Sequence, residues 1–173
     1  MILTAQEIQK QVKKRDIVIT PFDKTCLKPN SYIYHLGSKL VEVVDVGDRK
    51  RKPKTKEFTI PKKGYILKPN KLYLATTVEK IGSKKFVTSL IGRNRIAKLG
   101  MFLQITADLG QLGKAHKWTL EIKVVKKLRI YPNMEIGQVL FWQTKGRREI
   151  GETEFYATKD IPYPSQLFKQ TPK

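Results

Sequence analysis

Apolar and polar residues alternate along most of this chain with the period of a β-strand. After Asp16, short apolar stretches recur, and most of them end at a glycine, a proline or an asparagine. Many short strands with turns every ~8–12 residues are typical of an all-β sandwich or barrel. The predicted strands span residues 17–19, 32–36, 40–46, 65–67, 72–78, 86–91, 101–107, 118–125 and 139–142.

One short helix is predicted before the first strand. Ile8 and Val12 lie one helical turn apart and would pack this helix on the rest of the protein. Thr4 is placed to cap the helix, with Glu7 completing a capping box, and Leu3 and Ile8 have the spacing of a hydrophobic staple.

The 173 residues fit one domain, and 40% of them are hydrophobic, which is enough for a core. The strand pattern predicts a β domain over residues 1–144. It fades over residues 145–173, where aromatic residues predict a tail that packs on the domain or on a neighbouring subunit. These aromatic residues are Phe155, Tyr156, Tyr163 and Phe168.

The charge is strongly positive. The chain has 35 Lys and Arg against 15 Asp and Glu, a formal net charge of +20. Such an excess favours a polyanionic partner: nucleic acid, nucleotides or an anionic membrane surface. The densest segment is predicted to be a loop projecting between two strands, either a nucleic-acid contact or a solvated loop. Its basic residues are Arg49, Lys50, Arg51, Lys52, Lys54 and Lys56.

Several function classes are disfavoured. Cys26 is the sole cysteine, which excludes an internal disulfide, and with two histidines it offers too few ligands for a typical zinc site, so no protein-held metal is expected. No stretch approaches the ~20 continuous apolar residues of a membrane span. Since the N-terminal residues also lack the apolar region of a signal peptide, we expect an intracellular protein without a membrane partner.

Several segments, in order and in register over roughly residues 1–142, resemble the dCTP deaminases of the dUTPase superfamily. They are Lys28-Pro29-Asn30-Ser31-Tyr32, Gly92 to Gly100, Thr106-Ala107, Thr119-Leu120-Glu121 and Asn133 to Gln138. The resemblance implies a distorted β-barrel or jelly-roll that assembles as a homotrimer, with nucleotide sites between subunits.

The resemblance also implies roles for residues. Glu121 occupies the position of the strand glutamate that activates water for attack on the cytosine ring, without zinc. A triphosphate, accompanied by Mg²⁺, would be held around the Gly92–Gly100 segment, and the base would be read nearby. The implied nucleotide-binding residues are Arg93, Asn94, Arg95, Lys98, Thr106, Ala107 and Gln138.

The sequence departs from the family pattern at several positions. Asn94 and Arg95 replace two serines of the phosphate segment, and Lys98 replaces an arginine, which loses the two-pronged geometry of a guanidinium. Gln111 stands where the superfamily has an aspartate. An amide cannot activate water, so dUTPase activity is not expected.

Three hypotheses follow. The first is a catalytically inactive family member whose basic surface binds DNA or RNA, for which a viral or mobile-element origin would fit. The second is an active dCTP deaminase that converts dCTP to dUTP with Glu121 as general base. The third is a trimeric scaffold for a protein partner. Glu121 could equally be a structural glutamate paired with Lys123.

Overall fold

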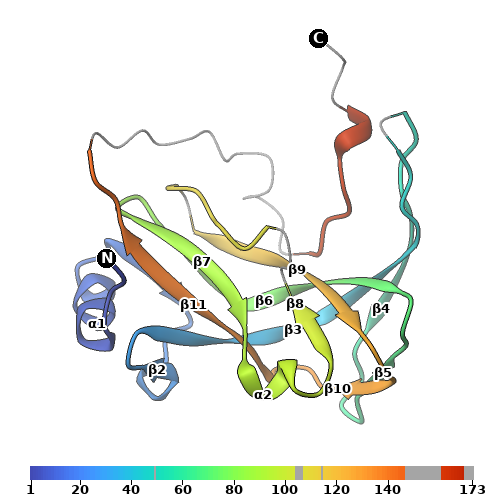
Figure 1. Cartoon of the computed structure of the whole chain (residues 1–173), viewed down its shortest axis with the longest axis horizontal. Coiled ribbons are helices and arrows are strands. Elements are labelled where there is room, and N and C mark those ends of the chain that lie inside the picture. Colours follow the sequence, from blue (N-terminus) through green and yellow to red (C-terminus); the bar gives the residue numbers. More distant parts are fainter. Residues whose placement is uncertain (49, 104–106, 114, 147–160, 170–173) are drawn as a thin grey trace.

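In the computed structural model, the chain forms a nearly closed, distorted antiparallel β-barrel with one short helix packed outside it (Figure 1). The structure describes residues 1–48, 50–103, 107–113, 115–146 and 161–169. Its elements are α1 (Ala5–Lys13), β1 (Ile17–Thr20), η1 (Lys24–Cys26), β2 (Leu27–Lys28), β3 (Ser31–Asp45), β4 (Lys54–Thr59), β5 (Tyr65–Leu67), β6 (Leu72–Ser83), β7 (Phe86–Gly92), α2 (Asn94–Ala97), β8 (Met101–Leu103), β9 (His116–Val124), β10 (Leu128–Ile130), β11 (Glu135–Gln143) and η2 (Leu167–Lys169).

The main sheet runs β7-β11-β3-β6-β9-β8, with β1 on β6 and both β2 and β4 on β3. Residues 108–110, which follow β8, nearly close it, because they hydrogen-bond to β7. The amide of Leu90 donates to the carbonyl of Asp108 at 2.8 Å, and the amide of Gly110 donates to that of Thr88 at 2.7 Å. A second, two-stranded sheet pairs β5 with β10. The predicted all-β barrel with an N-terminal helix is confirmed.

β3 is one 15-residue strand, so the prediction of two strands separated at Gly37-Ser38 was wrong. The chain does not turn there. Its register against β6 shifts between Leu36 and Leu40. A Cβ on Gly37 would lie 2.6 Å from Thr76 Oγ1, so the glycine permits a close approach that other residues would block. A bulge therefore replaces the expected turn.

Two other local predictions need correction. Lys54 and Lys56 belong to strand β4 and not to a loop, because β4 pairs along β3. Thr55, between these two exposed lysines, and Phe58, two residues after Lys56, are half-buried. Thr4 is the N-cap residue of α1, but its side chain makes no capping hydrogen bond.

In place of the capping box, the Glu7 carboxylate accepts hydrogen bonds from Gln11 Nε2 and Lys10 Nζ. Leu3 and Ile8 are both buried, as a hydrophobic staple requires.

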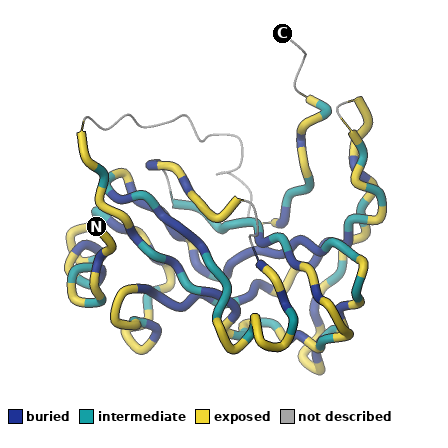
Figure 2. Tube along the Cα trace, viewed as in Figure 1, coloured by how far each residue is buried: buried dark blue, intermediate teal, exposed yellow. Residues whose placement is uncertain are grey.

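Large buried side chains fill the barrel (Figure 2). Tyr34 is fully buried and its hydroxyl donates to the carbonyl of Ile91 at 3.3 Å. Its ring lies directly on Gly137, where a Cβ would come within 2.1 Å of both Tyr34 Cζ and Oη. The Ile-Gly-Gln segment singled out in the sequence therefore has a packing role: only a glycine leaves room for this tyrosine. The largest fully buried side chains include Tyr32, Tyr34, Tyr73, Phe141 and Ile8.

Candidate functional site

Glu121 lies on the outer face of the barrel wall, in the middle of β9. Its neighbours Leu120 and Ile122 are completely buried in the core, so the intervening glutamate points the other way, as predicted. On that outer face, Glu121 pairs with Leu74 of β6, and Leu74 with Val41 of β3. Both apolar side chains are buried, 5% and 4% exposed, so the carboxylate borders a dry surface.

The C-terminal segment, residues 161–169, lies against this outer face. The amide of Tyr163 donates to Thr119 Oγ1 at 3.4 Å, and Thr119 shares the face of Glu121, two residues along β9. Pro162 and Gln166 are buried, and Figure 1 shows the segment rising beside β9. Tyr163 and Phe168 are half-buried. Phe155 and Tyr156 lie outside the described residues.

This partly buried setting changes the acidity of the carboxyl group. Desolvation by burial raises the pKa of Glu121 above its ordinary value. A carboxylate with a raised pKa holds a proton more readily, which is what a general base needs near neutral pH. The position is thus chemically competent for proton transfer to or from a bound molecule.

The segment expected to hold phosphate forms the short helix α2 between β7 and β8. Asn94, Arg95 and Lys98 are exposed there. Arg93 is only partly exposed, and its guanidinium forms an ion pair with the carboxylate of Glu135 on β11. Three of the four predicted phosphate residues therefore face solvent together, whereas Arg93 is already engaged within the protein.

The phosphate segment and Glu121 lie apart within one chain. Gly100, just after α2, packs against Val125, where a Cβ would lie 2.3 Å from Val125 Cγ2. Val125 is four residues beyond Glu121, so about 13 Å of strand separates the two places. The structure does not bring Glu121 and α2 into one pocket of a single subunit.

The remaining nucleotide-binding candidates are scattered. Ala107 is exposed and begins the segment that closes the barrel, and Thr106 lies outside the described residues. Gln138 is half-buried on β11, and its Oε1 accepts a hydrogen bond from Ser31 Oγ at 3.0 Å. Its amide therefore fixes the start of β3, a structural contact that its sequence position did not show.

Residues 108–113 cross the Trp118 side chain. A Cβ on Gly110 would lie 2.1 Å from Trp118 Cη2 and 2.3 Å from Thr88 Oγ1, so this segment packs tightly on the indole. Gln111, which replaces the superfamily aspartate, is exposed. Close packing at Gly110, and not a proline-glycine turn, positions the segment around Gln111.

Sequence reasoning missed Glu79. It is 2% exposed on β6, and its carboxylate accepts from the His35 amide at 2.9 Å and lies 2.6 Å from His35 Nδ1. The signal was an acidic residue directly after the predicted strand 72–78.

The basic loop is partly neutralised. Arg51 pairs with Asp45 through both oxygens and lies 3.9 Å from Asp48. The Arg51 guanidinium holds the pKa of Asp45 at about 2. Arg49 lies outside the described residues. Besides Arg51, the exposed cations among the described residues of the segment are Lys50, Lys52, Lys54 and Lys56.

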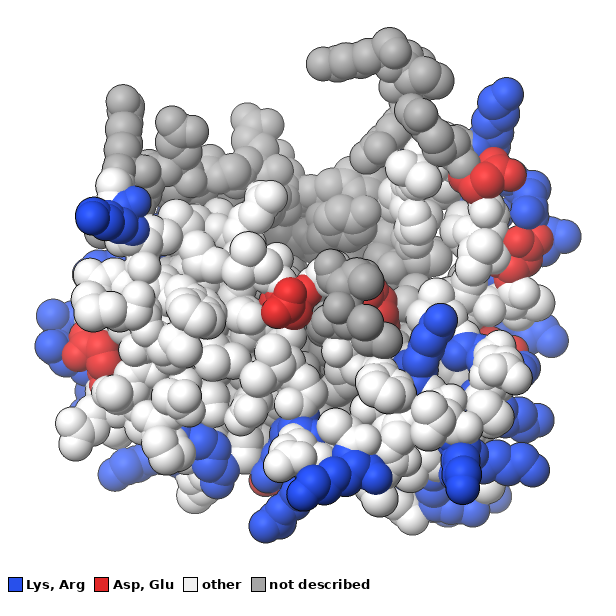
Figure 3. Space-filling model, in the orientation of Figure 1, with Lys and Arg blue, Asp and Glu red and all other residues white. Residues whose placement is uncertain are grey.

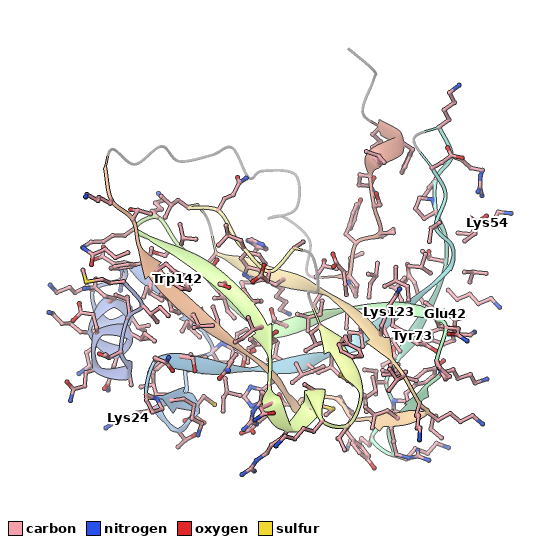
Figure 4. All side chains as sticks on the ribbon, viewed as in Figure 1. Lys24, Glu42, Lys54, Tyr73, Lys123 and Trp142 are labelled. Carbon is pink, nitrogen blue, oxygen red and sulfur yellow. The ribbon has the colours of Figure 1, made fainter. Side chains whose placement is uncertain are left out.

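Charge is unevenly spread over the visible face of the molecule. Figure 3 shows most Lys and Arg along the lower and right edges and a smaller group at the left, with acidic side chains at the left edge, near the centre and at the right edge. In Figure 4, Lys54 projects from the β3–β4 hairpin, at the opposite end of the molecule from Lys24.

The described residues contain no group of three or more His, Cys, Asp or Glu side chains placed to hold a metal ion. None of their helices is long and apolar enough to cross a membrane.

Comparison with known proteins gives consistent relatives. A protein named "dCTP deaminase, dUMP-forming" from Hathewaya histolytica is 42% identical over 170 residues, covering 98% of both chains. One of the same name from Clostridium acetobutylicum is 39% identical, with the same coverage. A "dCTP deaminase" from Rhodopirellula baltica is 35% identical over 98% of this chain and 86% of that protein.

A solved structure shares the fold. The crystal structure of 2'-deoxycytidine 5'-triphosphate deaminase from Agrobacterium tumefaciens matches with a TM-score of 0.64 and 16% identity over 81% of this chain; this chain spans about half of that one, 47%. The dCTP deaminase-like family matches residues 2–144. With this match and relatives of 35–42% identity over nearly its whole length, the chain belongs to the dCTP deaminase-like family.

Proposed function

We propose that this protein is an active dCTP deaminase and that Glu121 is its general base. The observation that carries the proposal is a glutamate with a burial-raised pKa on a rigid strand, at the position where the family resemblance places its base. The names of the full-length relatives support this second hypothesis over the first, since nothing in the comparisons indicates an inactive or nucleic-acid-binding protein.

The proposed reaction is a hydrolysis at C4 of cytosine. The Glu121 carboxylate takes a proton from water while the water oxygen forms a bond to C4. The same proton is then delivered to the 4-amino group, the C4–N bond breaks, and ammonia leaves. Leu74 and Val41 limit solvent beside the carboxylate, which keeps its proton affinity high.

The triphosphate would bind at α2 of another subunit. Asn94, Arg95 and Lys98 are exposed around α2, and Gly100, which follows them, packs on Val125, about 13 Å of strand beyond Glu121. A homotrimer with sites between subunits would unite the two halves. Mg²⁺ would arrive on the nucleotide phosphates.

The product of the first step is dUTP. Several relatives are named dUMP-forming, which adds a cleavage of the triphosphate as a second candidate activity. That cleavage also needs an activated water, and Gln111 cannot accept a proton as an aspartate does. We therefore propose dUTP as the main product.

The test is a chromatographic assay with dCTP and Mg²⁺ that resolves dUTP from dUMP. Glu121→Gln should lower kcat by about 10²–10⁴-fold, the usual contribution of a general base. Glu57→Gln is the matched control, because Glu57 is an exposed glutamate in the same cross-strand row, paired with Val41. No turnover by the wild-type protein, or equal activity of the two variants, would contradict the proposal.

A further inference from the structure

The two-stranded sheet β5–β10 carries an unusual concentration of positive charge. Residues 58–78 and 122–134, which contain both strands and their flanks, hold eight Lys or Arg and no Asp or Glu. Seven of these cations are exposed, Lys123 on β9 among them, and the six on the small sheet and its flanks define what we call the basic surface. They are Lys62, Lys63, Lys68, Lys126, Lys127 and Arg129.

The pairing of the strands brings these cations together. Arg129 is opposite Ile66, and both side chains point outward, away from the buried Leu67 and Ile130. Lys68 and Lys127 directly adjoin the Leu67–Leu128 pair, so they extend the same outward row. Because the strands are antiparallel, Lys62-Lys63 lie beyond the Ile130 end of this small sheet and Lys126-Lys127 at its Leu67 end, so the cations run along its whole length.

Protein carboxylates do not neutralise this surface. Within the part of the chain that the structure describes, none of its five lysines forms an ion pair, and Arg129 Nη1 donates to the Lys63 carbonyl at 3.1 Å. The neighbouring Lys71 is different, since it pairs with Glu42. The hairpin loop is different too, since Asp45 and Asp48 compensate Arg51. Repulsion between these like charges is relieved when an anion binds among them.

Three exposed apolar side chains lie among the cations. Val125 is 58% exposed, Tyr131 is 45% exposed and Ile66 is 41% exposed. Tyr131 packs on the Lys62–Gly64 turn, where a Cβ on Gly64 would lie 2.9 Å from its Cε1. An exposed ring surrounded by cations is the arrangement that stacks an unpaired base while the flanking phosphates are neutralised.

We propose that the basic surface binds single-stranded nucleic acid, with Tyr131 as a stacking group. Its phosphate contacts come from the uncompensated lysines. Three partly exposed apolar side chains give little area for insertion into a bilayer, whereas one ring is enough for a base. The site is separate from Glu121, so its occupancy does not depend on the proposed deaminase activity.

The experiment measures binding of fluorescent oligo(dT), oligo(U) and a DNA duplex to the full chain by anisotropy at several salt concentrations. About four phosphate contacts predict a log–log slope near −3, equivalent to a loss of about 50-fold between 50 and 200 mM salt. The test variant changes Lys62, Lys68, Lys126 and Lys127 to Gln, and should flatten this slope. Tyr131→Ala should weaken binding about 5- to 100-fold at an unchanged slope.

The matched control changes Lys13, Lys14, Lys24 and Lys28 to Gln. These lysines are exposed too, and Lys24 lies at the far end of the molecule (Figure 4). Equal weakening by both quadruple variants, a salt-independent affinity, preference for duplex, or stronger binding to anionic phosphatidylserine vesicles would overturn the proposal. Deaminase assays of the same variants report folding and separate this result from the proposed function.

Discussion

Replacing Gly137 by alanine should destabilise the protein through the Tyr34 ring. The new Cβ would lie 2.1 Å from Tyr34 Cζ and Oη and 2.7 Å from the Ile91 carbonyl oxygen, far inside van der Waals contact. Tyr34 is fully buried and cannot swing into solvent. Overpacking of this kind costs about 1–3 kcal/mol, and the lost tyrosine hydrogen bond about 1 kcal/mol more.

We therefore expect the free energy of unfolding to fall by about 3 kcal/mol, which corresponds to a Tm about 6–12 °C lower for a chain of this length. Calorimetry or urea unfolding, at one protein concentration, would measure it. Gly92→Ala is the matched control: Gly92 is the strand partner of Gly137, and its Cβ would meet nothing closer than 3.9 Å.

A double-mutant cycle separates the Tyr34 contact from other effects of the alanine. In a Tyr34→Ala background, the added Cβ has room, so Gly137→Ala should cost much less there. A wild-type Tm for the single variant, or an equal cost in both backgrounds, would refute this account of the Ile-Gly-Gln segment.

Two further predictions concern the candidate site. Burial raises the pKa of Glu121, so the wild-type protein loses stability as pH rises through that pKa and the carboxyl group ionises. Glu121→Gln should therefore be the more stable protein at pH 8. The Tm difference should disappear near pH 4, below the ordinary glutamate pKa of about 4.3. An equal Tm difference at both pH values would contradict it. Gly110→Ala should push the 108–113 segment off Trp118 and red-shift its fluorescence, whereas an unchanged spectrum and Tm would show that the segment accommodates the methyl group.

Local patterns in the sequence predicted most of the barrel but not its bends. Period-two alternation located β1, β5, β7 and β9, since one face of each strand is buried. It failed at Gly37, where a glycine needed for close approach to Thr76 is indistinguishable from a turn glycine. It failed again at Lys54 and Lys56, because an edge strand with exposed lysines has the same composition as a loop.

The candidate site shows the same division. The apolar residues Leu120 and Ile122, which are buried in the structure, flank Glu121 in the sequence. They made the direction of the Glu121 side chain predictable, since alternation along a strand is a local property. Pairing of Arg93 with Glu135, and placement of Lys62-Lys63 and Lys126-Lys127 at the two ends of one small sheet, depend on contacts between distant segments. Net charge alone pointed to the 49–56 loop, whereas the distribution of acidic partners favours the β5–β10 sheet.

The long strand β3 also affects how the barrel opens. Its first half hydrogen-bonds to β2 and β11, and its second half to β4 and β6, so it belongs to both sides of the wall. If the two sides separate, the hydrogen bonds between β3 and one of them must break. Amide protons on both sides should therefore exchange with deuterium in a single cooperative event, so that the strand that carries Glu121 is protected as long as the opposite wall holds.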